Sequence, residues 1–540
     1  MLQVGSPKSF FFQHGRAPAP SLHLATFRQH AMHFTGVALA MGAEMFLSTA
    51  IAVALPDIAG SFGASPDETS WVMTVYLIGF TVFLPLSAFL TDALGQRLYI
   101  ALSTVAFMVS AAACAFSHSL PEMLVWRSIQ GAAGAAFLVR YYVSVPGRLL
   151  PKSRRIGLFF AAIPFAIRGF GPAVGGYLTE SLSWRWVFLA AVPLAGVSLL
   201  ALCFATDPWP RRRHPMPDLP GFILLACGLG SVCTLLVRGE VDDWLGERGM
   251  ALLVIVAVVA LPLFIWRQHH PSNRNPLFNL HSLAHRGVWP GLIFAGLFGF
   301  ATQAGLYLIP QYLRSLGRND AISSGLVFTF DSASTAFFLV VVTAGMAFIH
   351  SRVWLFLAGA AFAAAMGMIA YQQNSQPANE TLYLPLVLRG FTLAACIYPL
   401  PDMTLRHVVA VSADYLAEAR ASYEMLRQLG AAIGVATVSY LLDYYQTFHT
   451  TRLSEHLTSV DRVAIGARKL VSRQLAAHGV SPFQLGAASR AAIHKVTLRE
   501  ANALAFENVF WVLALAGVAM CVVTLLFARK KPLQKDLALQ

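Results

Sequence analysis

The stretch AIRGFGPAVGGYLTESLSWRWVFL, Ala166 to Leu189, places a charge, a proline and paired glycines inside an otherwise apolar segment. Pro172 has no backbone N–H, and Gly171, Gly175 and Gly176 have no side chains. A helix with these residues can bend, and a neighbouring helix can approach it closely. The stretch therefore suits a membrane helix at a tight or moving crossing, with a plain packing patch as the alternative reading.

The composition of the chain indicates a membrane protein. Of 540 residues, 56% are hydrophobic and only 12% are charged, which is more apolar surface than a soluble fold of this size can bury. Runs of about 20 apolar residues, the length that crosses roughly 30 Å of hydrocarbon, recur along the chain. The sequence predicts an all-α polytopic protein with about fourteen spans, which begin near Ala31, Ser70, Leu98, Leu124, Ile156, Trp186, Leu219, Met250, Val288, Ala321, Val353, Leu382, Ala421 and Phe506.

Charge placement predicts the orientation, because Lys and Arg in short loops stay on the cytoplasmic side. The first thirty residues show no cleavable signal peptide, so the first span is expected to act as the insertion signal. With the N-terminus inside, the inner loops hold fourteen cations: Arg97, Arg148, Lys152, Arg154, Arg155, Arg211, Arg212, Arg213, Arg267, Arg274, Arg286, Arg352, Arg406 and Arg420. The outer loops hold five: Arg185, Arg238, Arg248, Arg314 and Arg318. Both termini are predicted to be cytoplasmic, and cations so dispersed do not predict nucleic-acid binding.

The order of the spans divides the chain into two halves and an insert. Six spans come before a Pro- and Arg-rich loop, two follow it, and six more complete the chain. We expect a cytoplasmic tail at 1–30, an N-terminal six-helix bundle at 31–206, a two-helix insert with its loops at 207–287, a C-terminal six-helix bundle at 288–528 and a cytoplasmic tail at 529–540. Within the last bundle, residues 445–505 form a long polar outer segment, for which short amphipathic helices are predicted.

A set of motifs in the expected order resembles the major facilitator superfamily. They are FLTDALGQR (89–97), WRSIQGAAGAA (126–136) and GFGPAVGGYL (169–178). Further stretches narrow the resemblance to the fourteen-span drug:proton antiporters of the EmrB type: SWRWVFLAAVP (183–193), YLIPQYLRSLG (307–317), RQLGAAIGVA (427–436) and REANALAFENVF (499–510). The resemblance implies two six-helix bundles plus two inserted helices, a central cavity between the bundles, and alternating access driven by protons.

The first two motifs also imply roles for individual residues. By resemblance, Asp92, Gly95 and Arg97 form a charge latch that holds one conformation, although Ala88 replaces the usual glycine and Ala93 a frequent arginine. In the fourth span, Arg127 and Gln130 match the family motif, and a buried guanidinium there can change the proton affinity of a nearby carboxylate. Loop capping and a purely structural arginine are the alternatives.

Two acids stand where the chain departs from the family. Relatives often carry an acid where this chain has Leu47, and Glu44 lies one helical turn earlier on nearly the same face. Asp331 follows Phe330 in the tenth span, where the family commonly has a proline. Charged residues at membrane depth are costly and usually functional. We therefore expect both acids to carry protons or bind cationic substrate, with hydrogen bonding inside the bundle as the alternative; the sequence leaves open how Arg168 and Arg389 pair with them.

No cofactor or metal is predicted. The histidines His269, His270, His281 and His285 include an HxxxH spacing, but they supply too few ligands for a membrane diiron enzyme, so a solvated basic loop is the preferred reading. All six cysteines fall within predicted spans, and no GxxxxGK[ST] loop is present.

These observations favour a proton-driven exporter of drugs or other amphipathic compounds in the inner membrane. Its expected partners are small-molecule substrate, protons and the lipid bilayer, and the resemblance implies a periplasmic adaptor with an outer-membrane channel docked through residues 445–505. Two alternatives stay open: export of a specific metabolite such as a siderophore or fatty acid, and a polytopic membrane enzyme that uses the histidine-rich loop.

Overall fold

A computed structural model describes residues 24–144, 154–205, 218–238, 246–270, 273, 277, 288–317, 320–346, 348–372, 379–411, 416–455, 462–477, 481 and 483–526. These residues form α-helices with short connections, and no β-strand occurs among them. A helix satisfies its own backbone hydrogen bonds, which a bilayer cannot do for it. The all-α prediction is confirmed. Most of the tails predicted at 1–30 and 529–540 lies outside the described residues, except that the first helix already begins at Leu24.

The N-terminal bundle comprises α1 (Leu24–Phe62), α2 (Pro66–Leu94), α3 (Gln96–Phe116), α4 (Leu120–Ser144), α6 (Arg154–Ser181) and α7 (Arg185–Cys203). Within it, α1 packs on α6 and α7, and α4 packs on α2 and α3. Ser65 begins α2 with a capping box, in which Glu68 N–H donates to the Ser65 hydroxyl and the Glu68 carboxylate accepts from Ser65 N–H.

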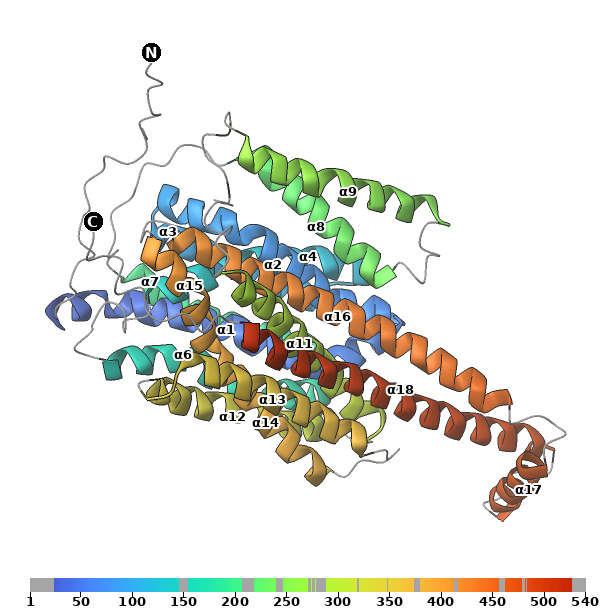
Figure 1. Ribbon diagram of the computed structural model, residues 1–540. Helices are drawn as coiled ribbons and strands as arrows, with labels where there is room; N and C mark the ends of the chain where they lie inside the picture. Colours follow the sequence, from blue (N-terminus) through green and yellow to red (C-terminus); the bar gives the residue numbers. More distant parts are fainter. Residues whose placement is uncertain are drawn as a thin grey trace.

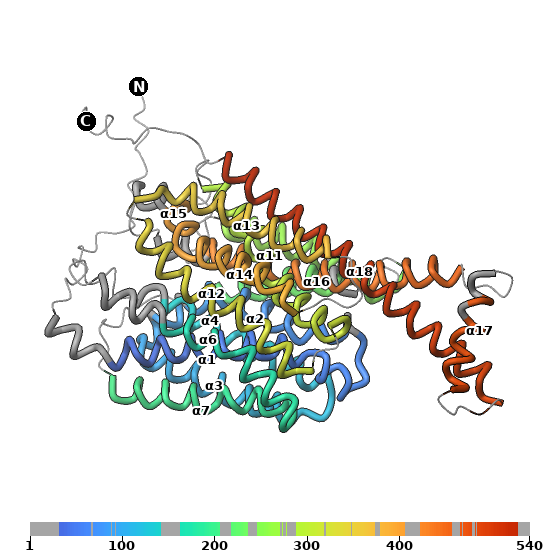
Figure 2. The backbone as a smooth tube through the Cα atoms, turned by 90° about the horizontal axis from the view of Figure 1, so that it is seen from below, coloured from blue at the N-terminus to red at the C-terminus, as the bar shows by residue number. Residues whose placement is uncertain are grey.

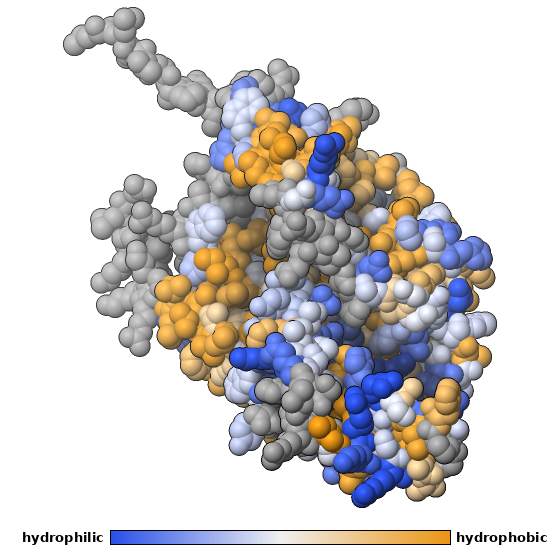
Figure 3. All heavy atoms as spheres, turned by 90° about the vertical axis from the view of Figure 1, so that its right-hand side faces the viewer, coloured by the Kyte–Doolittle hydropathy of each residue, from blue (hydrophilic) through white to orange (hydrophobic). Residues whose placement is uncertain are grey.

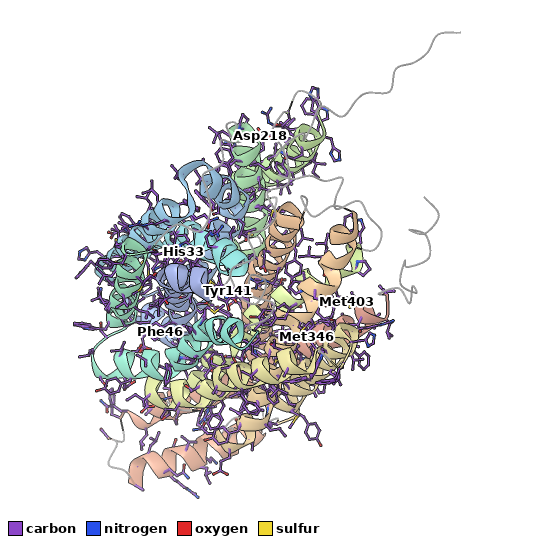
Figure 4. The ribbon with its side chains drawn as sticks, turned by 90° about the vertical axis from the view of Figure 1, so that its left-hand side faces the viewer. His33, Phe46, Tyr141, Asp218, Met346 and Met403 are labelled. Carbon is purple, nitrogen blue, oxygen red and sulfur yellow. The ribbon has the colours of Figure 1, made fainter. Side chains whose placement is uncertain are left out.

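The C-terminal bundle comprises α11 (Trp289–Ser315), α12 (Ala321–Gly345), α13 (Ser351–Tyr371), α14 (Asn379–Ile397) with α15 (Pro399–Val411), α16 (Leu416–Glu455) and α18 (Leu485–Leu526). Figure 2 shows the blue-to-teal helices on one side and the yellow-to-red helices on the other. The bundles meet where α6 packs on α12, α2 on α16, and α1 on α11. Figure 4 looks at them from another side, with His33 and Phe46 in the first bundle and Met346 and Met403 in the second.

A separate hairpin, α8 (Leu219–Arg238) and α9 (Arg248–His269), lies at the edge of the molecule (Figure 1). Its Leu225, Leu229 and Phe264 form an apolar cluster with Val82 of α2, against which Met425 of α16 also packs. The hairpin therefore covers the line along which α2 and α16 meet, which we call the α2–α16 seam.

A buried carboxylate holds the base of this hairpin together. Asp218 accepts hydrogen bonds from Arg267 Nε at 2.7 Å, Gln268 Nε2 at 3.1 Å, Asn273 Nδ2 at 2.8 Å and Gly221 N–H at 3.0 Å. Figure 4 labels Asp218 in the hairpin, away from the two bundles. Because its oxygens are fully engaged, we assign Asp218 a structural role.

Eleven helices of the described chain are long and apolar enough to cross a membrane. The remaining predicted spans correspond to α8, whose apolar stretch Leu219–Leu235 is shorter, and to α4 and α6, which carry arginines. With those three, the helices correspond to the fourteen predicted spans. Exposed Val109, Leu200, Val258, Phe337 and Leu515 face outward, as lipid-facing side chains do.

The long polar outer segment contains one short helix of the predicted kind, while most of its other described residues belong to two long helices. In the structure α16 continues to Glu455 and α18 already begins at Leu485, so both span helices extend beyond the bundle, with α17 (Arg462–Ala477) at their tip. We call residues 445–455, 462–477 and 485–505 the stalk. His449 Nε2 lies 2.8 Å from Asn508 Nδ2 and joins the two long helices, and Arg499 donates to Leu316 O at 3.0 Å at the base. Residues 485–505 of α18 are rich in Ala and Leu, which favour helix, and neither 445–455 nor 485–505 contains a proline that would end one.

Candidate functional site

The N-terminal bundle holds a buried acid, Glu44, in the middle of α1. The residue is 8% exposed, and its carboxylate accepts a hydrogen bond from the Tyr76 hydroxyl of α2 at 2.5 Å. The Arg127 guanidinium of α4 lies 4.4 Å from the centre of the Tyr76 ring and donates through Nε to Val72 O at 3.0 Å. Arg127 also donates to Gln130 Oε1, so the two residues of the fourth-span motif contact each other beside the acid.

The C-terminal bundle holds the second acid, Asp331, in the middle of α12. Its Oδ1 lies 2.6 Å from Arg389 Nη1 of α14, and neither side chain is more than 1% exposed. Arg389 Nη2 also donates to Thr302 O of α11 at 2.7 Å. Gly305 makes room for this arginine, because a Cβ there would lie 2.7 Å from Arg389 Nε. The structure thus pairs Asp331 with Arg389, a choice that the sequence left open.

Arg168 of α6 lies within electrostatic range of both acids. It is attracted electrostatically to Asp331 and to Glu44, and repelled by Arg389 and Arg427. Its Nε is buried and has no hydrogen-bond partner within the described chain. Glu44, Arg127, Arg168, Asp331 and Arg389, with Tyr76 and Gln130, form what we call the central charge cluster.

Sequence reasoning missed two contributors to this region. Tyr76 carries no signal in the sequence, because its role depends on how α2 faces α1. Glu424 of α16 is 3% exposed and accepts from Arg427 Nε at 2.8 Å. Glu424 lies three residues after Ala421, where this span is predicted to begin, and Arg420 and Arg427 flank it. An acid among such charges resembles the end of a membrane helix, so the sequence contains no signal of its burial.

The glycines of the quoted stretch lie at two helix crossings. A Cβ at Gly175 would lie 2.8 Å from Ala50 Cα of α1, and one at Gly171 would lie 2.9 Å from Phe46 O. Gly176 contacts the backbone of Ala321 on the other side.

The same crossing involves α12 of the other bundle. A Cβ at Gly325 would lie 3.0 Å from the Pro172 carbonyl carbon, so backbone meets backbone here. Helix α6 remains continuous through Pro172. Its small residues therefore let one helix contact both α1 and α12 closely.

The predicted latch residues lie at the α2–α3 connection. Gly95 has a φ of 85° and joins the two helices in a conformation that side chains disfavour. Arg97 is exposed and donates to Cys203 O at the end of α7, which is a contact within the N-terminal bundle. The side chain of Asp92 lies outside the described residues.

Polar contacts join the two bundles at the stalk end of the molecule. Arg314 of α11 approaches Asp57 of α1 with two nitrogens, at 2.9 Å and 3.0 Å from its oxygens. Glu180 of α6 accepts from Ala321 N–H, the first residue of α12, at 3.1 Å. Beside it, donation from Ser323 N–H lowers the pKa of Asp320. These contacts tie the bundles together at this end.

A groove of about 540 Å³ lies on the outside of the N-terminal bundle, and α2, α3, α4 and Ala226 of α8 line it. It is separated from Tyr76 by the crossing of α2 and α4, where Gly131 lies directly against the Tyr76 backbone. Within the described chain, no three His, Cys, Asp or Glu residues form a group that could hold a metal. His281 and His285 lie outside the described residues. The central charge cluster is therefore the candidate site.

Comparison with known proteins supports this reading of the fold. The chain is 25% identical over 503 residues to the multidrug export protein EmrB of Escherichia coli, which covers 92% of this chain and 94% of that protein. It is 23% identical over 494 residues to the protein of the same name in Haemophilus influenzae, at 90% and 93% coverage. A putative multidrug resistance protein, MdtD of E. coli, is 32% identical over 292 residues, which is 50% of this chain and 61% of that protein.

Solved structures share the fold at low identity. A POT family transporter in complex with a thioalcohol-conjugated peptide superposes with a TM-score of 0.59 at 12% identity, covering 92% of this chain and 95% of that one. An inward-facing bacterial homologue of the human lysosomal transporter Spinster gives 0.55 at 12% identity, with 95% and 98% coverage. The expected resemblance to EmrB-type transporters is confirmed. Since the Major Facilitator Superfamily profile matches residues 37–435, the chain belongs to the major facilitator superfamily.

Proposed function

We propose that this protein is a proton-driven antiporter that exports drugs or other amphipathic compounds across the inner membrane. One observation carries the proposal: each bundle buries an acid in the middle of a membrane helix, Glu44 hydrogen-bonded to Tyr76 in one and Asp331 paired with Arg389 in the other. A transporter that alternates between two conformations needs a charge whose partner depends on protonation. The names of the relatives, multidrug export proteins, indicate the substrate class.

The cluster suggests how protons change the contacts between the bundles. When Asp331 takes up a proton, its attraction to Arg389 and Arg168 weakens, and Arg168 turns toward Glu44. When Glu44 is protonated instead, Arg168 is drawn toward α12. Because α6 touches both α1 and α12, each proton shifts the balance between contacts within the N-terminal bundle and contacts across to the other bundle.

The energy that a proton releases in crossing the membrane potential is sufficient to drive export of a compound against its gradient. At a potential of 100 mV one charge supplies about 2.3 kcal/mol, and each 1.4 kcal/mol corresponds to about a tenfold gradient. One proton can therefore support more than a tenfold gradient of a neutral compound without ATP.

The contacts at the stalk end suggest which state the structure represents. With both termini in the cytoplasm, as the loop charges predict, the stalk end faces the periplasm. The Asp57–Arg314 pair and the Glu180 contact then close the outer mouth, and they must break when substrate leaves. We assign the Asp92, Gly95 and Arg97 region to the cytoplasmic side, where it stabilises the alternative state, and we assign the stalk to a periplasmic adaptor that leads to an outer-membrane channel.

Transport by the purified protein tests the proposal. The full chain is reconstituted in proteoliposomes loaded with ethidium, and a pH gradient is imposed. We expect ethidium to move against its gradient and to stop when a protonophore collapses the pH difference. The same assay is repeated with a panel of compounds that includes a siderophore and a fatty acid. Export of many of them would indicate a broad substrate range, and export of one would indicate a specific metabolite exporter. Transport indifferent to the pH gradient would overturn proton coupling.

A further inference from the structure

A small pocket lies outside the central charge cluster, where the stalk leaves the C-terminal bundle. Three helices supply its walls, with Tyr312 of α11, Ile369 and Ala370 of α13, and Glu500 and Glu507 of α18 among the lining residues. The lining residues of α11 and α13 lie in the last turns of those helices, whereas α18 continues into the stalk (Figure 1). The pocket is therefore at the level where the membrane spans end. Its cavity of about 40 Å³ has room for a few water-sized groups, since one water needs about 10–15 Å³.

Three polar groups line this pocket without partners among the described residues. Tyr312 is 5% exposed, and its ring packs edge-on against Phe506 and Phe510, with centroids 5.5 Å and 5.3 Å away. These contacts hold the ring at the pocket wall, and its hydroxyl has no hydrogen-bond partner in the described chain. Neither Glu500 nor Glu507 forms an ion pair or a hydrogen bond with a described residue. Since buried hydroxyls and acids at membrane depth are normally paired, the three groups suit a ligand with positively charged N–H donors.

The acids continue a lipid-facing stripe of α18. Glu500, Leu504, Glu507, Trp511 and Leu515 follow one another at spacings of three or four residues, which places them on one face of the helix. Leu504, Trp511 and Leu515 are exposed, as side chains that face lipid are. An exposed tryptophan at the end of a span is typical of the membrane–water interface, where lipid headgroups lie. A lipid whose chains lie along this stripe therefore has its headgroup beside Glu507 and Tyr312.

From this arrangement we propose that the pocket binds the ammonium group of an aminophospholipid such as phosphatidylethanolamine. The ammonium donates to the Glu507 carboxylate and to the Tyr312 hydroxyl, and the aromatic rings add a cation–π attraction. Glu500, two helical turns closer to the stalk, attracts the charge from the exposed rim. A choline headgroup carries three methyl groups in place of the N–H donors, so it is too large for the cavity and leaves the hydroxyl without a donor. The bound headgroup joins α11 to α18 at the base of the stalk, and this role goes beyond the proposed antiport and does not depend on it.

Native mass spectrometry tests the binding without any transport measurement. The full chain in detergent is titrated with phosphatidylethanolamine and with phosphatidylcholine of identical acyl chains. We expect the parent protein to bind phosphatidylethanolamine about tenfold more tightly, because hydrogen bonds to a charged group are stronger than neutral ones. Equal affinity for the two lipids would overturn the proposal.

Variants of the pocket test where the lipid binds. Glu507→Gln should remove most of the preference for phosphatidylethanolamine. Tyr312→Phe keeps the ring contacts and removes only the hydroxyl, so it should lower the preference by about threefold without changing the thermal unfolding midpoint. The control Glu455→Gln removes an exposed acid elsewhere on the stalk and should keep the full preference. An unchanged preference in Tyr312→Phe and in Glu507→Gln would overturn the assignment, and Tyr312→Phe alone decides it if Glu507→Gln does not fold.

A soluble competitor separates a lipid from a free amine. Glycerophosphoethanolamine has the same headgroup without acyl chains, so it should displace phosphatidylethanolamine only at a concentration at least about a hundredfold higher, because burial of the chains along α18 contributes to lipid binding. Displacement at equal concentration would show that the pocket recognises a small amine and would overturn the lipid assignment. Ethidium export in proteoliposomes reports on the antiport separately, so a failure of proton coupling and a failure of lipid binding are distinguishable.

Discussion

At the scale of single residues, the two central acids are held in different ways. Glu44 accepts one hydrogen bond from a neutral tyrosine, whereas Asp331 contacts a guanidinium at 2.6 Å. A hydrogen bond from a hydroxyl is compatible with either protonation state of the carboxyl, because a protonated carboxyl keeps an acceptor oxygen. An ion pair loses most of its attraction when the acid is protonated. Glu44 can therefore change its charge with less rearrangement than Asp331.

The acids differ accordingly in their expected response to neutralisation. Glu44→Gln keeps an acceptor for Tyr76 and should abolish coupling while leaving folding nearly unchanged. The accumulated ethidium gradient should fall by about tenfold for each unit of pH difference, since one proton crossing such a difference supplies about 1.4 kcal/mol. Proteoliposome uptake with an imposed pH gradient measures this effect. Full pH-driven export in Glu44→Gln would remove this acid from the coupling site.

Asp331→Asn leaves the Arg389 charge buried without its counterion. Breaking one partner of a buried pair typically costs about 3–5 kcal/mol, so we expect a lower midpoint of thermal unfolding as well as lost export. The double variant Asp331→Asn/Arg389→Gln should regain thermal stability but not transport. Restored transport in that double variant would show that the pair is structural.

At the scale of helices, α6 is packed closely on two sides, because it contacts α1 of its own bundle and α12 of the other. We expect Gly175→Leu to stop transport, since its added atoms would collide with Ala50 of α1, an overpacking that costs about 1–3 kcal/mol. The control Val174→Leu adds bulk to a neighbouring exposed side chain and should transport normally. Ethidium export and equilibrium binding, measured on both variants, separate blocked movement from lost affinity. A normal rate in Gly175→Leu would show that this crossing neither packs tightly nor moves.

The helices also show what the sequence could and could not predict. The spans could be predicted from the lengths of the apolar runs, and the close helix crossing from the GPxxGG stretch. Both depend only on residues that are neighbours along one helix. The pairing of Asp331 with Arg389 depends on how α12 and α14 are rotated about their axes. The contact of Tyr76 with Glu44 likewise depends on the depth at which α2 and α1 face each other. Hydropathy does not encode rotation or depth, so these contacts required the structure.

At the scale of the whole molecule, loop charges predict that the α12–α13 connection is cytoplasmic and the stalk periplasmic. Phe348, in the α12–α13 connection, is 89% exposed, and Phe483, just before the stalk part of α18, is 96% exposed. Single cysteines at these positions, in a background without the native cysteines, should react with an impermeant maleimide from opposite sides. Labelling of Phe348→Cys in intact spheroplasts would reverse the assigned orientation.

The stalk is the proposed docking surface for the adaptor. Its helix α17 carries Arg468, Lys469 and Arg473 and no acid, and exposed Leu470 and Phe483 lie close along the chain. Figure 3 views this end of the molecule, where hydrophilic side chains gather at the lower edge with apolar ones among them. Such a mixed surface suits a protein partner with acidic and apolar groups.

Shortening the stalk tests this role. Replacing residues 454–490 with a small polar linker should leave ethidium export in proteoliposomes intact, because the central charge cluster is unaffected. The same variant should no longer co-purify with an adaptor or protect cells that have two membranes. Co-purification that survives the deletion would rule out docking through the stalk.

The continuity of α18 has a mechanical consequence. A single helix of 42 residues runs from the stalk to the far end of the C-terminal bundle, about 63 Å at 1.5 Å per residue. If the bundle tilts about the membrane centre, displacement grows with distance from that point, so the tip of this helix moves farther than any part of it inside the bundle. Under the proposed antiport, we therefore expect a partner bound to α17 to move once in every transport cycle, and a partner that holds α17 fixed to slow transport.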